Sequence, residues 1–234
     1  MDVNALEIID PILITGCARS GTSLTAGIIH LCGAQKGLAE GKSKYNAKGQ
    51  FENTAIRDHV TKPYLRSIGA DPMCQKPLPD VAQVIQDSLS NDFIKRWRSL
   101  VLESFYAQDV ALSKPWFYKG AKMCLMWQIW HNAFPTSKWI IVRRDSNDIA
   151  ESCMKTSFMR AYNTKADWID KWIRPHLMRF AEMHSHFNCF EVWPDRAVKG
   201  DFSQIKEMIN FCGLTFNEEE VTNFITPSLW GKKP

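Results

Sequence analysis

The stretch GCARSGTS near the N-terminus combines glycines and hydroxyl side chains at the spacing of a phosphate-binding loop. A Walker A loop reads G-x-x-x-x-G-K-[ST]; here Gly16, Gly21 and Ser23 occupy their places, while Thr22 stands where the lysine belongs. Glycines let the backbone approach an anion closely, and the hydroxyls and the guanidinium of Arg19 can donate to phosphate or sulfonate oxygens. Since the Walker lysine reaches the β- and γ-phosphates, its replacement disfavours a nucleoside triphosphate as the ligand.

A second group of polar residues lies in the stretch IVRRDSNDIAES. Arg144 is predicted to end a strand, and Ser152 lies eight residues later, two turns into a helix for which Ser146 is the predicted N-cap. Both side chains can then face a ligand at the carboxyl edge of the strand. A guanidinium and a hydroxyl in this arrangement suit a second phosphate.

The elements that must position these residues alternate between strands and helices. Apolar runs predict strands at Pro11–Thr15, Ala34–Leu38, Pro115–Gly120, within SKWIIVRRD, and at Phe190–Trp193 or Ala197–Lys199. Helical spacing follows the loop from Thr22 up to Gly33, and further helices are predicted between 54 and 113, over 121–134, after Ser146, over 165–186 and twice near the C-terminus. We therefore expect a single-domain three-layer α/β/α protein over residues 1–234, with a central parallel sheet like that of P-loop NTPases and a ligand at the carboxyl ends of its strands.

Composition narrows the functional classes. The 234 residues are 45% hydrophobic and 23% charged with a net charge of +4, which argues for a local anionic site and against a surface that coats nucleic acid. Seven cysteines without C-x-x-C pairs predict reduced, buried thiols and no zinc site. No signal-peptide pattern or apolar run of ~20 residues is present, so a cytoplasmic protein is expected.

Together, GCARSGTS and RDSNDIAES resemble the two cofactor motifs of sulfotransferases that use 3′-phosphoadenosine 5′-phosphosulfate (PAPS), in the right order and roughly 120 residues apart. The resemblance implies that the first loop holds the 5′-phosphosulfate and that Arg144 and Ser152 hold the 3′-phosphate. The loop residues carried over are Ala18, Arg19, Ser20, Gly21, Thr22 and Ser23. The RSGT form looks more like the Golgi and bacterial branches than the cytosolic one, and the segments NAKGQFEN and FSQIKEMINFCGLTF extend the likeness.

Sulfuryl transfer needs fixed cations at the leaving phosphate oxygen and a base for the acceptor proton. The resemblance implies PAPS as donor, 3′-phosphoadenosine 5′-phosphate (PAP) as product and no required metal, with Arg19 and Lys119 touching the transferring group. The cytosolic branch uses a histidine as base, but Ala121 stands at that position, so the base is expected to be Glu40, as in Golgi and bacterial relatives, or else Glu52. The histidines are assigned no catalytic or metal role.

Two other functions remain open at this point. A P-loop small-molecule kinase would need a strand-end aspartate for Mg²⁺, for which Asp145 is the candidate. A non-catalytic nucleotide-binding protein would keep the loop without a base.

The acceptor can be a small molecule, carbohydrate, lipid or peptide, and the oligomeric state is open. Lys232 and Lys233 match a late basic segment of the family loosely. Residues 41–113 and 155–190 are expected to shape the acceptor pocket, with the aromatic candidates Tyr45, Phe51, Trp97, Trp116, Phe158, Trp168 and Trp172.

Overall fold

The computed structural model describes residues 8–39, 41 and 46–230. Within these ranges four parallel strands form one sheet in the order β2-β1-β3-β4, with β1 at Ile12–Gly16, β2 at Phe117–Lys119, β3 at Lys138–Val142 and β4 at Cys189–Val192. The parallel sheet predicted from the alternating pattern is confirmed. Because all four strands run the same way, the segments that follow β1, β2 and β3 emerge at one edge.

Both faces of the sheet are buried because its strands are apolar on both sides. In β1, Leu13 points into one hydrophobic cluster, while Ile12 and Ile14 point into the other. In β3, Trp139 and Ile141 belong to the first cluster, and Ile140 and Val142 belong to the second. Near-continuous apolar strands of this kind are typical of a parallel sheet covered by helices on both faces.

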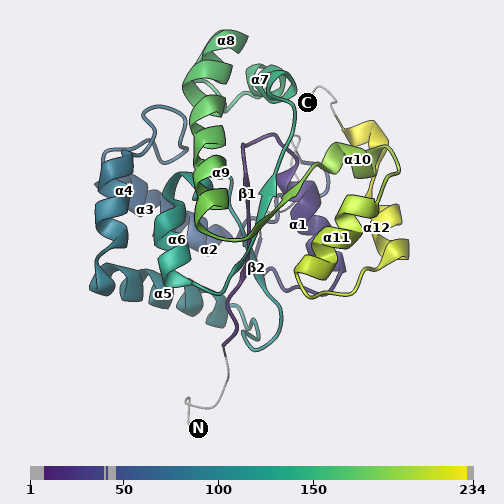
Figure 1. Cartoon of the computed structure of the whole chain (residues 1–234), viewed down its shortest axis with the longest axis horizontal. Helices are drawn as coiled ribbons and strands as arrows, with labels where there is room; N and C mark the ends of the chain where they lie inside the picture. Colours follow the sequence, from purple (N-terminus) through teal and green to yellow (C-terminus); the bar gives the residue numbers. More distant parts are fainter. Residues whose placement is uncertain (1–7, 40, 42–45, 231–234) are drawn as a thin grey trace.

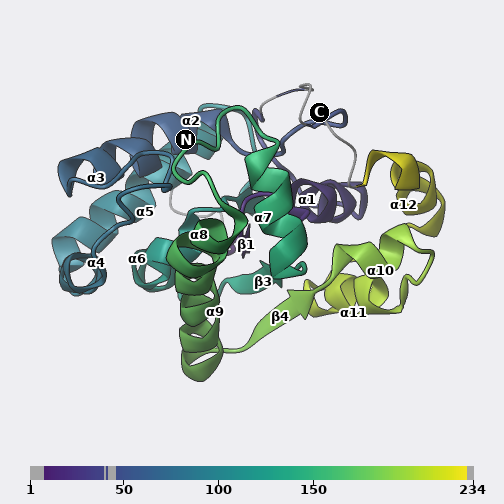
Figure 2. The same ribbon diagram turned by 90° about the horizontal axis from the view of Figure 1, so that it is seen from above.

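Helices cover the two faces unequally, as Figure 1 shows. One face is covered by α1 (Thr22–Leu31), α10 (Pro194–Val198), α11 (Ser203–Phe211) and α12 (Glu218–Phe224), followed by a 3₁₀ turn at Pro227–Leu229. The other face carries α2 (Thr54–Ile56), a π-helical turn (Arg57–Thr61), α3 (Lys62–Ser67), α4 (Val81–Ser88), α5 (Asn91–Tyr106), a 3₁₀ turn (Met123–Met126), α6 (Trp127–Ala133), α7 (Ser146–Met154), α8 (Lys165–Trp168), a second π-helical turn (Ile169–Ile173) and α9 (Arg174–His186). Figure 2 looks onto the carboxyl edge of the sheet, from which α1 and α7 lead away.

The predicted strand at Ala34–Leu38 is wrong. Among the described residues this segment makes only one isolated bridge, from Gln35 to Trp116, and a second bridge joins the next residue, Ala39, to Asn53. Its backbone is satisfied in part by a side chain, since the N–H of Leu38 donates to the Gln108 amide oxygen over 2.6 Å. The segment therefore runs as an irregular edge in place of a fifth strand.

Two other local predictions need correction. The last strand is β4, close to the first of the two alternatives, whereas Ala197 lies in α10, which Pro194 begins at a position where proline is favoured. Helix α7 is capped by Asp145 and not by Ser146, which is its first residue.

The seven cysteines are all free and buried, as predicted. Across the described ranges, no helix combines the length and the apolar character that a bilayer span needs.

Candidate active site

The loop between β1 and α1 brings its backbone close to the neighbouring strand. At Gly16 a Cβ atom would lie 2.6 Å from the carbonyl oxygen of Val142, the last residue of β3. Arg19 has φ 72° and Gly21 has φ 102°, both in the left-handed region, which an arginine rarely adopts. The close approach requires glycine at position 16, and the strained arginine is of the kind that clusters at functional sites.

The start of α1 is open to an anion. The helix begins at Thr22 without a side-chain cap, so the N–H groups of its first turn can bind a negatively charged ligand. The Ser20 hydroxyl is fully buried and has no hydrogen-bond partner within the described chain. A buried hydroxyl without a partner is uncommon, and an oxygen of a bound anion would supply one.

Arg19, Arg144 and Ser152 meet beside this loop. The Nε of Arg19 donates a hydrogen bond to the Ser152 hydroxyl over 3.0 Å. A terminal guanidinium nitrogen of Arg144 donates to the carbonyl oxygen of Arg19 over 3.0 Å, although 125 residues separate the two. The fold therefore joins the two motifs that the sequence analysis selected.

Arg144 lies two residues beyond the end of β3 and not at the strand end, since β3 stops at Val142. Its side chain is 13% exposed, and the Asp148 carboxylate is 3.7 Å from its Nε. That Nε is buried and donates no hydrogen bond to any described residue. The guanidinium lies 4.9 Å from the ring centre of Trp230, which covers this end of the site. Arg144 is thus a largely buried cation with an unused N–H group.

Asp145, the residue considered for Mg²⁺, has a structural role. Its carboxylate accepts hydrogen bonds from the N–H groups of Asn147 and Asp148 and so caps α7. Among the residues that the structure describes, no group of three or more His, Cys, Asp and Glu side chains could hold a metal ion.

The segment before α2 folds over the start of α1 and carries Glu52. The Ser23 hydroxyl donates to the Gln50 carbonyl over 3.1 Å and accepts from the Asn46 amide over 3.0 Å. On the other side of Glu52, the side chain of Asn53 caps α2. Anchors on both sides therefore fix the position of the Glu52 carboxylate.

A cavity of about 350 Å³ lies between this segment and the loop. Its walls include the predicted site residues Ala18, Arg19, Thr22, Ser23, Glu52 and Lys119, further polar residues at Asn46, Gln50, Arg57, Lys62, Lys122 and His176, and an apolar part with Met73, Cys74, Ala121, Phe158, Met159 and Trp172. Loop, base candidate and lysine therefore share one cavity.

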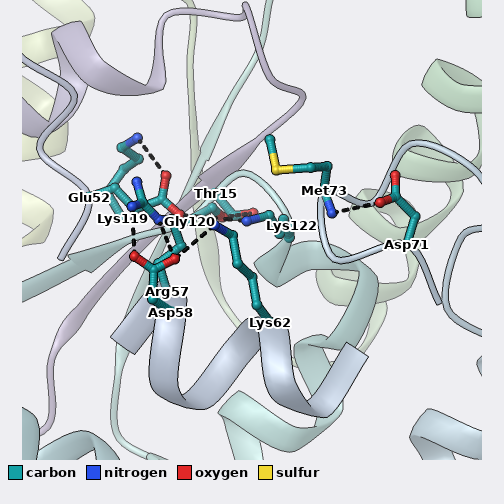
Figure 3. Close-up of polar contacts among 10 residues, drawn as sticks. All are labelled: Thr15, Glu52, Arg57, Asp58, Lys62, Asp71, Met73, Lys119, Gly120 and Lys122. Carbon is teal, nitrogen blue, oxygen red and sulfur yellow. Dashed lines mark hydrogen bonds and ion pairs between the residues drawn. The ribbon is translucent and has the colours of Figure 1, made fainter. Parts of the chain in front are cut away.

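Glu52 and Lys119 form an ion pair inside this cavity (Figure 3). Lys119 Nζ lies 3.5 Å from Glu52 Oε2, and Lys122 Nζ lies 4.0 Å from Glu52 Oε1. The Lys119 side chain is only 5% exposed, so it is not a strand-end lysine in water. Burial lowers the pKa of Lys119, and the Glu52 carboxylate opposes that shift. A lysine and a carboxylate in this arrangement can exchange partners with a bound substrate.

The turn after β2 holds these groups in place. The Thr15 hydroxyl in β1 donates to the Gly120 carbonyl over 3.1 Å and accepts from the backbone N–H of Cys124 over 3.1 Å. The turn that follows Lys119 and carries Lys122 is thereby fixed to the central strand.

Most sequence candidates lie at this edge of the sheet, and some fall outside the described residues. Glu40, the first choice for the base, is among the latter, as are Tyr45, Lys232 and Lys233. Of the aromatic residues expected around the acceptor, Phe158 and Trp172 line the cavity. Trp97, Trp116 and Trp168 are core residues, and Phe51 packs against Phe224.

Four residues of the cavity wall were not predicted from the sequence: His176 and the cations Arg57, Lys62 and Lys122. His176 is fully buried, and its Nδ1 lies 2.7 Å from the carbonyl oxygen of Trp172. Because a carbonyl only accepts, Nδ1 carries the proton and Nε2 is an acceptor. Burial lowers the pKa of His176 to about 4, so the ring is neutral near pH 7. No local pattern marks these residues, since only the fold brings the π-helical turn at Arg57–Thr61, α3, α9 and the turn after β2 together.

Comparisons with known proteins agree with this geometry. The family model described as "Sulfotransferase family" matches residues 11–218. A sulfotransferase domain of an olefin synthase from Synechococcus is similar over 97% of this chain and 88% of its own, with 14% identity and a TM-score of 0.59. A sulfotransferase from Mycobacterium tuberculosis is similar over 97% of this chain and 74% of its own, with 13% identity and a TM-score of 0.51. A sulfotransferase domain from the curacin biosynthetic pathway gives 12% identity and a TM-score of 0.54 over 96% of this chain and 90% of its own. No match was found among the curated protein sequences.

Proposed function

The chain belongs to the sulfotransferase family and is a sulfonyl-transferring enzyme, and on that premise we propose that PAPS is its donor. PAPS has two anionic ends, a 5′-phosphosulfate and a 3′-phosphate, so its binding requires two places for anions. The loop after β1 and the pair Arg144 and Ser152 are two such places, linked through Arg19.

The observation that carries this proposal is a pair of buried polar atoms that have no hydrogen-bond partner among the described residues. Ser20 Oγ lies in the loop and Arg144 Nε lies in the second motif, and neither has a hydrogen-bond partner in the described ranges. Leaving such groups unpaired is unfavourable by roughly 1–3 kcal/mol each. An anion at each place would satisfy both, which supports one ligand with two charged ends.

PAPS, when bound, supplies the sulfonyl group and leaves as PAP. We propose that Arg19 and the first-turn N–H groups of α1 hold the 5′ end and stabilise the charge that develops on the leaving phosphate oxygen. Arg144 and Ser152 then hold the 3′-phosphate, for which the planar guanidinium is suited.

Glu52 is the proposed base for the proton of the acceptor hydroxyl or amine, because it lines the cavity beside Lys119. When the Glu52 carboxylate takes the proton it becomes neutral, so the Lys119 ammonium loses its negatively charged partner. The Lys119 ammonium can then donate to the transferring sulfonyl group or to the leaving oxygen. Glu40 stays a second proposal for the base.

A thermal-shift titration tests the donor. PAP is expected to raise the midpoint of unfolding much more than ATP with Mg²⁺ or adenosine 5′-phosphate, because only PAP reaches both anion places. At 100 times its dissociation constant, PAP would add about 2.7 kcal/mol of stability. A larger shift with ATP and Mg²⁺ would favour the kinase alternative and overturn the proposal.

We further propose that residues 1–234 act as one domain in the cytoplasm. Both hydrophobic clusters pack on the same sheet, and free, buried cysteines are typical of a reducing compartment.

A further inference from the structure

Among the described residues of the cavity wall, positive charge exceeds negative charge. Five of the described lining residues are cationic, Arg19, Arg57, Lys62, Lys119 and Lys122, against the single carboxylate of Glu52. The proposed function uses Arg19 and Lys119 for the donor. The other three cations have no part in it.

Of these three cations, Lys122 lies farthest from its ion-pair partner. Its side chain is 12% exposed, and the oxygen of its ion-pair partner, Glu52, lies 4.0 Å away. Within the described chain its ammonium donates no hydrogen bond, and Glu52 is closer to Lys119. Lys122 lines the cavity, so its ammonium can donate to an anionic group bound there.

Arg57 and Lys62 are held in place by one acid. Arg57 donates to Asp58 over 2.8 Å, and Lys62 donates to the same carboxylate over 2.7 Å (Figure 3). These contacts hold the pKa of Asp58 well below its usual range. Because Asp58 shares its one carboxylate with Arg57, it neutralises Lys62 only in part, and the Lys62 and Arg57 side chains both line the cavity.

Another part of the cavity wall is apolar. Met73, Phe158, Met159 and Trp172 give the cavity an apolar part. The indole N–H of Trp172 is bonded to the Cys74 carbonyl over 2.7 Å, so this ring is fixed. A ligand that fits both parts carries an apolar body and a charged group.

We propose that the acceptor is an anionic molecule, with a carboxylate, phosphate or sulfate bound by Lys122, Lys62 and Arg57 and an apolar body against Trp172 and its neighbours. This inference rests on the proposed function, since it assigns the remaining cations to the acceptor after the donor has taken Arg19, Lys119, Arg144 and Ser152. Neutral sugars and alcohols without a charge are then poor acceptors.

The test uses pairs of probes that share a body and differ in charge. Phenyl phosphate is compared with phenol, hydroxyphenylacetate with hydroxyphenylethanol, and hexanoate with hexanol. Binding to the full chain is measured by calorimetry with and without saturating PAP. In at least one pair the anionic member is expected to bind about tenfold or more tightly than its neutral partner, as a charge-assisted hydrogen bond would give.

Three variants locate the effect. Lys122→Met and Lys62→Met keep an unbranched apolar side chain and remove the ammonium, so each is expected to reduce the preference for the anion about tenfold. Lys199→Met is the matched control, because Lys199 is exposed and pairs with Asp195 on α10. PAP should bind all three variants within about twofold of the unmodified chain, which also shows that they are folded.

Three results would overturn the inference: no pair shows a preference, the preference survives in both cavity variants, or Lys122→Met weakens PAP as much as the anion, which would assign these cations to the donor. Failure of the proposed donor would look different. PAP would then not bind at all, while the probe pairs, measured without it on the unmodified chain and on Lys122→Met and Lys62→Met, would still decide whether these two cations prefer an anion.

Discussion

Replacing Arg144 with alanine tests how the 3′-phosphate of the proposed donor is bound, separately from its 5′ end. The Nε of Arg144 donates no hydrogen bond to the part of the chain that the structure describes, and its side chain is largely buried beside Trp230. A 3′-phosphate at this place would accept one charge-assisted hydrogen bond or more, each contributing about 1.5–3 kcal/mol. Arg144→Ala should therefore weaken PAP binding by roughly 10- to 150-fold per bond lost.

The variant also removes two contacts that do not depend on the 3′-phosphate. Arg144 donates to the Arg19 carbonyl and packs on Trp230, so the loop itself can loosen. That loss affects PAP and adenosine 5′-phosphate equally, because both carry a 5′-phosphate. The informative quantity is therefore the ratio of the two dissociation constants, measured by calorimetry on one protein preparation.

The neighbouring arginine is the control. Arg143 pairs with Glu191 and lies over the rings of Phe180 and Trp193, so Arg143→Ala should leave the ratio unchanged. The assignment of Arg144 is refuted if Arg144→Ala weakens both nucleotides by the same factor, or if Arg143→Ala shifts the ratio as much.

Three further predictions concern the base, the loop and a buried histidine. Glu52→Gln should lower kcat about 10²- to 10⁴-fold in a labelled-sulfate transfer assay while PAP affinity stays within about twofold, as expected for loss of a general base. Gly16→Ala should lower the free energy of unfolding by roughly 1–3 kcal/mol in a urea titration, because its Cβ would meet the Val142 carbonyl. For His176, the unfolded chain takes up a proton near pH 6.5 that the folded chain takes up only near pH 4, so stability should fall by about 3 kcal/mol as pH drops through this window and not at higher pH. His176→Phe should remove that part of the pH dependence.

Each of these has a control and a contrary outcome. Glu40→Gln tests the other base candidate, and a larger loss of kcat there than in Glu52→Gln would move the base to position 40. Gly33→Ala is the control for Gly16, since Gly33 also has a positive φ but a Cβ added there would have nothing within 4 Å; equal losses would mean that the contact with β3 is unimportant. If the pH dependence of unfolding is the same with and without His176, the buried ring does not titrate as described.

The fold could be predicted because its signals are local. The apolar runs of β1 and β3 and the glycine loop before α1 each depend on a short stretch of sequence, and the structure places them as expected. The segment at Ala34–Leu38 misled the prediction because its apolar residues do not pair with a strand. Its backbone is satisfied partly by the Gln108 side chain, 70 residues away, which no local pattern reports.

The candidate site could likewise be predicted from the sequence only in part. Arg19, Arg144 and Ser152 stand in motifs, so their residue types and order indicated an anion site before the structure showed their contacts. Lys62 and His176 carry no such signal, since their role comes from long-range packing around the cavity. Asp145 shows the reverse case: a charged residue beside a motif is engaged in capping a helix.

A crystal structure of the chain with PAP would decide whether one nucleotide is held at both ends. We expect the 5′-phosphate at the N–H groups of the first turn of α1 and the 3′-phosphate within hydrogen-bond distance of Arg144 and Ser152. PAP bound elsewhere, or bound with its 3′-phosphate away from both residues, would contradict the proposed donor site.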